Sequence, residues 1–542
     1  MEWPSILRGL TLIAGVFILG ACGSEESRPL TFVDASKDVG IDVSHSAFRW
    51  DVSTDPVAMM GGGLCWIDID NDGWLDLFVT DTWSNGEWGL WNRASSGRDV
   101  GVPTSHLLRN SEGTFTDVTA EWGASFEVRA NGCAAADLDN DGFTDLYVTT
   151  ERENLLLWNE GGTGFVEGAE PAGVESYGWS TGIAIGDVNN DGAMDLVVAG
   201  YADLNRARPE AQTGFPNTFE PIADVVYLNS SGGHGGTRRN FTEVDVGLEP
   251  DGYEYGLGVV LIDFDADGDL DLHVANDTQP NRLYRNDFDG TEMRFTDISA
   301  TSGLDDPNSG MGIATTHLDG DGLPEVVVTN LAGQGHVAAV SSADSYLYSS
   351  DAISDVGIDS TGWGASFGDF DNDGDADLLL ASGDIPIVDL AASGDTVSFL
   401  RNTNGQFTEE STAVGLGELP TRNARSIAVA DYDNDGDLDA AVSAIGEPLA
   451  LLQNQTEGGS WLIVDPGTPV PGMRLQVETE SGLTIDRVHT VGGSWLSSED
   501  PRVHIGLGDN VGQLHLRVWS ASGASLFDGE VSGNSVVSLD LE

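Results

Sequence analysis

Short apolar runs separated by Gly-rich and Asp-rich turns recur along most of the chain. Runs such as LFVT, LYVTT, LVVAG and VVVTN are only four or five residues long, are rich in β-branched residues, and soon meet Gly or polar residues. This pattern predicts buried β-strands, since a helix would need a longer stretch with a period of 3.6 residues. Glycine supplies 70 of the 542 residues, which indicates many tight turns.

An acidic core of nine residues precedes each of these runs, as in DFDNDGDAD before LLL. Seven copies are present, and the spacing between them is irregular. A constant core with variable spacing predicts repeated units joined by loops of different length. The copies, called loops 1 to 7 below, begin at Asp68, Asp137, Asp187, Asp263, His317, Asp369 and Asp431.

The loops resemble the calcium loop of an EF-hand but end differently. An EF-hand carries a bidentate Glu at position 12, whereas position 12 is Val or Leu in all seven copies. Position 9 is acidic in all seven, so we expect it to supply the closing ligand. Side chains at positions 1, 3, 5 and 9 and the carbonyl at position 7 would bind Ca²⁺, and Gly at position 6 allows the chain to reverse.

About six calcium sites are therefore expected. His317 is a poor calcium ligand, so we expect loop 5 (His317 to Glu325) to be empty or weak. The expected ligands are Asp68, Asp70, Asp72 and Asp76; Asp137, Asp139, Asp141 and Asp145; Asp187, Asn189, Asp191 and Asp195; Asp263, Asp265, Asp267 and Asp271; Asp369, Asp371, Asp373 and Asp377; and Asp431, Asp433, Asp435 and Asp439.

Two further landmarks follow most loops and complete a unit of four strands. One is an apolar segment ending in Asn, and the other begins with Phe, as in FTDVT. Four-stranded sheets repeated around a ring are the blades of a β-propeller, so we predict an all-β, seven-bladed propeller over residues 31–456. The seventh unit lacks the Phe landmark, whereas TFVDAS at residues 31–36 supplies one. The N-terminal strand should therefore complete the last blade.

The two ends of the chain have other patterns. Residues 457–542 alternate apolar and polar positions between Gly turns, which predicts a separate small β-sandwich-like domain. Residues 1–22 carry an apolar run too short for a comfortable membrane span, and its end, LGAC, resembles a bacterial lipobox. We expect an export signal with lipid on Cys22 and a linker at residues 23–30; ordinary secretion is the alternative.

Charge and cysteine content narrow the function classes. The formal net charge is −66, from 89 acidic and 23 basic residues, so nucleic acid would be repelled. Cys65 and Cys133 lie in apolar stretches ahead of loops 1 and 2. We expect two buried unpaired cysteines; a disulfide is the alternative that an exported chain permits.

Several motifs that suggest catalysis have a structural interpretation. GWSTG around Ser180 and GASFG around Ser366 match a nucleophile elbow, but each lies just before an acidic loop, where we expect the innermost strand of a blade. DVSHS at residues 42–46 lacks the alternating strands and helices of a magnesium-type site, and we expect His45 to be an ordinary packed or exposed residue. The sequence thus predicts that the protein is not an enzyme.

A ligand face is expected on the side of the ring opposite the acidic loops. The two longest insertions follow the second strands of blades 1 and 3, and binding sites favour loops displayed on a rigid scaffold. Their aromatic residues could contact a sugar or a partner protein, or could instead pack against their own loops. The candidates are Trp83, Trp88, Trp91 and Tyr201.

The loops and strands together resemble the FG-GAP and VCBS repeat families, the calcium-loop propellers that include the integrin α-subunit head. The segment GGSWLSSEDPRVHIGLG, followed by VWSASG, looks like the ASPIC/UnbV domain. That pairing is similar to the cartilage acidic protein family. The resemblance implies an extracellular or periplasmic calcium-binding module without agreed catalytic residues.

Our functional prediction is a calcium-binding propeller at the cell surface or in the envelope that recognises a protein or carbohydrate and contacts the membrane only through its lipid anchor. Two alternatives stay open at this stage. One is a polysaccharide lyase or hydrolase built on a calcium-rich propeller, and the other is a structural component of the envelope.

Overall fold

The computed structural model describes most of the chain from residue 28 to residue 539. The described ranges are 28–47, 55–84, 103–208, 214–230, 239–249, 252–318, 322–342, 345–348, 353, 356–387, 389–390, 393–456, 458–480, 482–510 and 512–539. The predicted signal, Cys22 and nearly all of the linker lie outside these residues. Among the described helices, none is long and apolar enough to cross a membrane.

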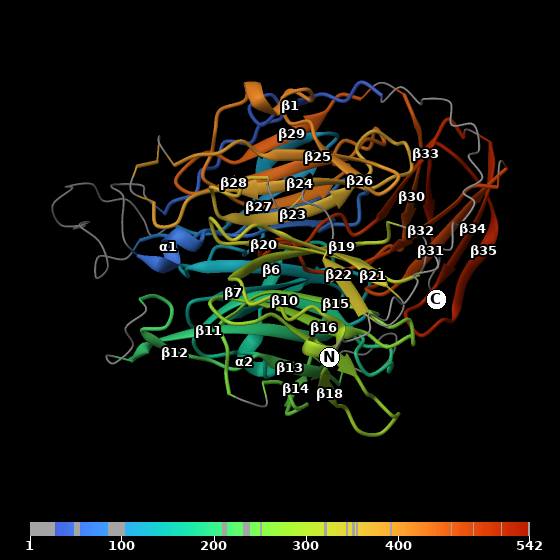
Figure 1. The fold of residues 1–542 in the computed structure, drawn as a ribbon. Helices are drawn as coiled ribbons and strands as arrows, with labels where there is room; N and C mark the ends of the chain where they lie inside the picture. The colour runs from blue at the N-terminus through green and yellow to red at the C-terminus, as the bar shows by residue number, and fades with distance from the viewer. Residues whose placement is uncertain are drawn as a thin grey trace, which may run out of the picture.

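Seven antiparallel sheets follow one another along the described part of the chain and form the blades of a propeller (Figure 1). The first strand of each blade contacts the first strands of the next and previous blades, and β2 of blade 1 also contacts β27 of blade 7, so the ring is closed. The prediction of an all-β propeller is confirmed, and the seven sheets match the predicted number of units.

The strands of the first four blades are as follows. Blade 1 consists of β2 (Leu64–Ile67), β3 (Asp76–Val79), β4 (His106–Ser111) and β5 (Thr114–Asp117). Blade 2 consists of β6 (Ala130–Ala136), β7 (Asp145–Thr150), β8 (Leu155–Asn159) and β9 (Phe165–Glu167). Blade 3 consists of β10 (Trp179–Gly186), β11 (Asp195–Ala207), β13 (Val225–Asn229) and β14 (Phe241–Val244), with β12 (Phe219–Pro221) paired to β11. Blade 4 consists of β15 (Gly256–Ile262), β16 (Asp271–Asn276), β17 (Arg282–Asn286) and β18 (Phe295–Asp297).

The remaining blades and the helices complete the ring. Blade 5 consists of β19 (Gly310–Thr316), β20 (Glu325–Asn330), β21 (Val337–Ser342) and β22 (Ser345–Tyr348). Blade 6 consists of β23 (Gly362–Gly368), β24 (Asp377–Ser382), β25 (Ser398–Thr403) and β26 (Gln406–Glu409). Blade 7 consists of β27 (Ala424–Ala430), β28 (Asp439–Ala444), β29 (Ala450–Asn454) and β1 (Phe32–Asp34). The helices are α1 (Pro56–Met60), α2 (Ala169–Ala172), α3 (Ser299–Ser302) and the 3₁₀ turn η1 (Leu416–Glu418).

The N-terminal strand closes the ring as the sequence predicts. Strand β1 pairs antiparallel with β29, with Phe32 opposite Asn454. Phe residues at the start of the outer strands are buried between blades; Phe115, for example, lies between Trp66 of blade 1 and Tyr432 of loop 7. The core is therefore a series of apolar layers between neighbouring sheets, which ties each blade to the next.

The C-terminal residues form two sheets packed face to face. One sheet contains β30 (Ser460–Asp465), β33 (Val503–Gly508) and β36 (Ser535–Ser538), and the other contains β31 (Arg474–Thr479), β32 (Thr484–Val488), β34 (Gln513–Trp519) and β35 (Ser525–Ser532). Their alternating apolar residues share one core that includes Leu462, Leu475, Ile505 and Leu516. In Figure 1 these sheets, in red, lie on one side of the ring, and α1 and β12 lie on the other.

The connection between β32 and β33 passes through the centre of the ring, which the sequence does not reveal. Residues 491–500, named the axial segment here, form bridges with inner strands: Ser498 with Cys65, Gly492 with Ala184, and Ser494 with Ile313. Trp495 in this segment is 0% exposed, and its ring centroid lies 4.9 Å from that of Trp363. A segment of the second domain thus fills the axis of the first.

Cys65 of β2 and Cys133 of β6 form a disulfide, so the expectation of two unpaired cysteines is wrong. Their strands are 68 residues apart in sequence but adjacent in the ring. Pairing was missed because it depends on two inner strands lying side by side at the right register, which no local pattern encodes.

Candidate metal centres

Each acidic loop folds around its first carboxylate. In loop 2, Oδ1 of Asp137 accepts a hydrogen bond from the amide of Asp141 (3.1 Å) and Oδ2 accepts one from the amide of Gly142 (2.9 Å). The same two bonds form in loops 1, 3, 4, 6 and 7. These bonds hold a tight turn that brings the remaining carboxylates to one side.

The carboxylate at position 9 joins the loop to the blade. One oxygen of Asp145 accepts from the amide of Leu138 (3.0 Å) and the other from the amide of Asn159 on the third strand (2.8 Å). Asp145 is fully buried, and burial raises the pKa of its carboxyl group well above the ordinary value. Burial likewise raises the pKa of Asp76 and of Asp271 to about 8. A cation beside these groups would favour their charged forms.

Position 3 provides the observation that best fits a cation. One oxygen of each carboxylate is held by a neighbouring side chain: Asp70 by Arg109 (2.8 Å), Asp139 by Arg239 (2.7 Å), Asp371 by Arg401 and Asp433 by Gln453 (2.8 Å). The other oxygen, Oδ1, is buried in all four and has no hydrogen-bond partner. A buried carboxylate oxygen without a partner is costly, and a bound Ca²⁺ would satisfy it.

Five loops gather three carboxylates whose ligand atoms all lie within 4.8 Å of one another. In loops 1, 2, 4 and 7 the three are positions 1, 3 and 9, whereas in loop 6 they are positions 1, 3 and 5. The groups are Asp68, Asp70 and Asp76; Asp137, Asp139 and Asp145; Asp263, Asp265 and Asp271; Asp369, Asp371 and Asp373; and Asp431, Asp433 and Asp439. Oxygen donors at this spacing suit a hard cation such as Ca²⁺.

The other expected ligands are arranged less tightly. At position 5, Asp72, Asp141 and Asp435 lie outside the three-carboxylate groups, and each accepts a hydrogen bond from the amide at position 7. In loop 3, Oδ1 of Asn189 accepts from the amide of Asp191 (3.0 Å). Among the described residues, loop 3 lacks a group of three acids, because a neutral amide stands at position 3.

Loop 5 is only partly described, because residues 319–321 lie outside the described ranges. The amide of Leu318 donates to Oε2 of Glu325 (2.6 Å), which reproduces the bond between positions 2 and 9 of the other loops. The expectation that loop 5 binds calcium weakly or not at all stays a prediction.

The Asn landmarks have a structural role that the sequence alone did not show. The Asn159 side chain donates to the carbonyl of Thr144 in its own loop (3.2 Å) and to that of Ile69 in the preceding loop (2.8 Å). Equivalent bonds join the loops at Asn110, Asn229, Asn286 and Asn454. The recurring Asn at the end of the third strand was the available signal, and its partners became visible only in three dimensions.

Direct bonds between neighbouring loops add to this ring. Asn71 at position 4 of loop 1 donates to the carbonyl of Gly142 in loop 2 (2.8 Å), and Asn434 of loop 7 donates to that of Gly73 in loop 1 (3.0 Å). Position 4 has a left-handed backbone, with φ of 56° at both of these residues. Asn tolerates that conformation better than most residues, which explains its recurrence there.

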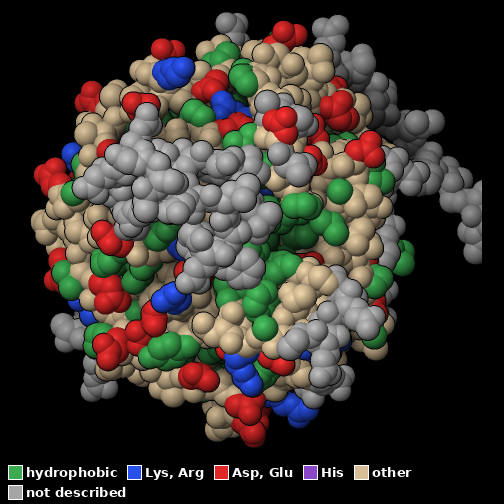
Figure 2. Space-filling model, turned by 90° about the vertical axis from the view of Figure 1, so that its left-hand side faces the viewer, with side chains coloured by type: hydrophobic (Ala, Val, Ile, Leu, Met, Phe, Trp, Pro, Cys, Tyr) green, Lys and Arg blue, Asp and Glu red, His purple; other side chains and the backbone are tan. Residues whose placement is uncertain are grey.

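The structure describes only two of the four aromatic residues of the predicted ligand face, Trp83 and Tyr201. Tyr201 is 0% exposed and packs against Trp179, Phe215 and Tyr255. For this residue the packed alternative is therefore confirmed, and contact with a ligand is ruled out. Trp83 is partly exposed, while Trp88 and Trp91 lie outside the described residues. Figure 2 views this side of the ring, where hydrophobic side chains gather near the centre. Buried aromatic residues there, including Trp363 and Trp495, form one apolar cluster over the axis.

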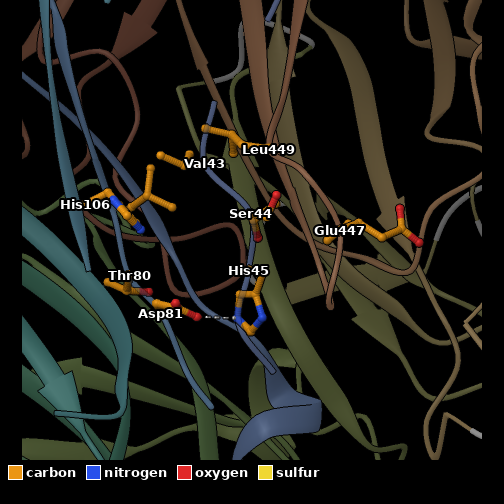
Figure 3. Close-up of a pocket in the computed structure, with 11 residues that line it drawn as sticks. Val43, Ser44, His45, Thr80, Asp81, His106, Glu447 and Leu449 are labelled. Atoms are coloured by element: carbon orange, nitrogen blue, oxygen red, sulfur yellow. Dashed lines mark ion pairs between the residues drawn. The ribbon is translucent and has the colours of Figure 1, made fainter. Parts of the chain in front are cut away.

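The motifs that suggest catalysis in the sequence have structural roles. Ser180 and Ser366 lie on the inner strands β10 and β23 and are each 1% exposed. His45 lines a small pocket between blades 7 and 1 together with Asp81 (Figure 3), and Nε2 of His45 lies 3.8 Å from Oδ1 of Asp81. Burial, with a contribution from the charge of Arg425, lowers the pKa of His45 to about 3, so the ring is neutral at physiological pH. The pocket measures about 10 Å³, too small for more than about one water molecule.

Comparison with known proteins agrees with this architecture. The model of the FG-GAP-like repeat matches residues 68–148, 137–198, 263–328, 317–380 and 387–442, which together exceed half of the chain. The chain belongs to the FG-GAP-like repeat family. Proteins of this family are typically extracellular or found at the cell surface, and the fold is that of a surface recognition propeller.

Curated relatives include cartilage acidic protein 1, as the resemblance of the sequence predicted. The mouse (Mus musculus) protein is 26% identical over 300 residues, covering 53% of this chain and 44% of that protein. The human (Homo sapiens) protein is 27% identical over 267 residues, covering 47% of this chain and 39% of that protein. The matches thus span less than half the length of these relatives.

The solved structures that match the chain are distant in sequence and have low TM-scores. An Agrocybe aegerita lectin that recognises non-reducing terminal N-acetylglucosamine shares 16% identity at a TM-score of 0.40, covering 66% of this chain and 88% of the lectin. The V. cholerae biofilm matrix protein Bap1 shares 13% identity at a TM-score of 0.34, covering 93% of this chain and 76% of Bap1. Likeness at this level carries no information about the ligand of this chain.

Proposed function

We propose that this protein is a calcium-binding propeller that recognises a protein or carbohydrate outside the cytoplasm and has no catalytic role. The observation that carries the proposal is the unpartnered, buried Oδ1 atom at position 3 of loops 1, 2, 6 and 7. In loop 6 this oxygen belongs to Asp371, which is 1% exposed and lies among two further carboxylates. Membership of the FG-GAP-like repeat family supports the same assignment.

Different groups of each loop would bind the ion and stabilise the turn. In loops 1, 2, 4 and 7 carboxylates at positions 1, 3 and 9 would hold the ion, and in loop 6 those at positions 1, 3 and 5 would do so. The amides bound to positions 1 and 9 keep the turn in shape, as in loop 2. A bound Ca²⁺ supplies positive charge that offsets the repulsion between the carboxylates. Because the ion binds the folded loop, it should stabilise the fold by mass action.

Calcium binding and ligand recognition would occupy opposite sides of the ring. The loops lie where the first strand of each blade ends, and the long connections after β3 and β11 leave the other side. Loops on a rigid scaffold are a common place for recognition. Lipid on Cys22 would hold the protein at the envelope, with the long connections available to a ligand.

Calcium titration of the metal-free protein tests this function. Isothermal titration calorimetry of chelator-treated protein should detect at least five sites, one for each group of three carboxylates. Asp139→Ala should remove one site, because it deletes the carboxylate whose buried Oδ1 faces the ion. Asp289→Ala is the matched control, since Asp289 is exposed in a turn after β17 and accepts only local hydrogen bonds.

Two results would contradict the proposal. One is the absence of calcium binding in the metal-free protein, and the other is an equal stoichiometry in Asp139→Ala and wild type. Mg²⁺ should bind far more weakly, because it demands an octahedral site at shorter distances than these flexible oxygen clusters provide.

A further inference from the structure

The C-terminal domain is docked directly on loops 6 and 7. Arg502 donates to the carbonyl of Asp431 (2.6 Å) and to Oδ1 of Asn434 (2.6 Å), at positions 1 and 4 of loop 7. A ring nitrogen of His504 lies 3.0 Å from the carbonyl of Gly436 at position 6. Arg502 is buried and its charge is balanced by Asp500 (2.8 Å), so the contact is part of the interior.

Loop 6 makes a similar set of contacts. Arg487 donates to the carbonyl of Gly374 (3.0 Å), and the amide of Gly508 donates to the carbonyl of Asn372 (2.8 Å). A Cβ atom at Gly506 would meet Asp369 at 1.9 Å, so the domain lies directly against the first ligand of this loop. Together, these bonds involve main-chain carbonyls at positions 1, 4 and 6 of the two loops.

Loop 2 has no such contact. Among the described residues, positions 137–145 make no hydrogen bond or ion pair with the C-terminal domain; their inter-loop partner is Asn71 of loop 1. The molecule therefore contains loops of the same sequence type with and without direct hydrogen bonds to the second domain.

The axial segment carries this docking to the far side of the ring. The amide of Trp66 donates to the carbonyl of Ser498 (3.1 Å), that of Cys133 to the carbonyl of Leu496 (3.2 Å), and that of Ile313 to the carbonyl of Ser494 (3.0 Å). These amides belong to blades 1, 2 and 5, and blades 2 and 5 are not neighbours of blade 7 in the ring, whereas blade 1 is. Exchange at Cys133 and Ile313 thus reports the position of the segment without contact to loop 7.

We propose that Arg502 is a positioning residue of the loop 7 calcium site, and that calcium in loops 6 and 7 holds the C-terminal domain and its axial segment in place. The inference rests on the proposed calcium function. Without a cation, three carboxylates within 4.8 Å repel one another, and any opening of the loop moves the carbonyls that Arg502 and His504 contact. By linkage, a domain that holds the closed loop must also strengthen calcium binding there.

Two matched variants of the full-length chain test the coupling. Asp433→Ala removes the carboxylate with the unpartnered oxygen of loop 7, and Asp139→Ala removes the equivalent carboxylate of loop 2. Hydrogen exchange of the calcium-loaded proteins, measured by mass spectrometry, should be about fivefold or more faster in the axial segment and at Cys133 and Ile313 for Asp433→Ala. Asp139→Ala should leave exchange at the axial segment and at Ile313 unchanged.

The two proposals fail in different ways. If neither variant loses a calcium site, the calcium function itself is wrong. If both lose one site and the axial segment exchanges equally fast in both, calcium binds but does not control docking, and the coupling is wrong.

Substitution of Arg502 tests the reverse direction. Arg502→Lys keeps the charge but loses the fork that reaches both Asp431 and Asn434, so it should weaken calcium binding at loop 7 by about fivefold or more. Arg517→Lys is the control, because Arg517 lies on β34 and pairs with the exposed Glu478 of the same sheet. Slow exchange in strand β34 will verify that the domain stays folded. Unchanged calcium affinity in folded Arg502→Lys would overturn the proposal.

Discussion

At the scale of single residues, burial decides the behaviour of acidic side chains beyond the loops. Between blades 3 and 4, Glu249 accepts hydrogen bonds from the amides of Asp224 (3.0 Å) and Glu254 (2.6 Å). Glu254 forms an ion pair with Arg282, and the charge of Arg282 lowers the pKa of Glu249 less than the neighbouring carboxylate of Glu254 raises it. Burial and these neighbours raise the pKa of Glu249 to about 7 and that of Asp224 well above its ordinary value.

This cluster predicts that the protein becomes less stable as pH rises through neutrality, even with calcium present. A carboxyl group whose pKa is higher in the folded state favours folding while it is protonated, so its contribution is complete below pH 4.5 and is lost as pH rises through about 7. Thermal unfolding between pH 5.5 and 8.5 in saturating calcium should show this loss, and Glu249→Gln should flatten the profile. An identical slope in the variant would contradict the assignment.

At the scale of elements, the nine-residue loop could be predicted from sequence because the hydrogen bonds that shape its turn are local. Its turn depends on bonds among positions 1, 2, 5, 6, 7 and 9, all of which lie within the motif. The strands that flank it follow from local apolar patterning. The partners of Asn159, by contrast, include Ile69, which is 90 residues away in sequence and belongs to another blade. Such contacts depend on blade order and could not be predicted locally.

Asn159 should therefore contribute more to the free energy of unfolding than an ordinary strand residue does. Asn159→Ala would leave the buried carbonyls of Ile69 and Thr144 without this donor, which should cost about 2–4 kcal/mol in the free energy of unfolding. Denaturant unfolding measures the loss, and Asn205→Ala at an exposed position of β11 is the control. A cost equal to that of the control would show that the inter-blade bonds contribute little.

At the scale of the whole molecule, the structure departs from local prediction in two places, the disulfide and the axial segment. Both depend on residues that meet only when the ring is closed. Leu64, for example, donates to Ser497, which is 433 residues away. The burial of Tyr201 could not be read locally for a related reason, because the aromatic residues that cover it come from three separate segments.

The Cys65–Cys133 disulfide should stabilise the ring measurably. A cross-link that spans 68 residues removes conformational entropy from the unfolded chain, worth about 4 kcal/mol in the loop-closure model. A Cys65→Ala, Cys133→Ala double variant should unfold at a correspondingly lower denaturant concentration, and peptide mapping without reductant should find the linked pair in the wild type. Recovery of both peptides with free thiols would contradict the assignment.

The axial segment also constrains the order in which the protein can be made. Inner strands β2 and β6 emerge from the ribosome several hundred residues before Leu496 and Ser498, whose carbonyls their amides contact. Until those later residues arrive, a growing chain can form blades but must leave their axial amides to water. Contacts of such long sequence separation are slow to form, so we expect the axial segment to enter the centre of the ring after the blades have formed.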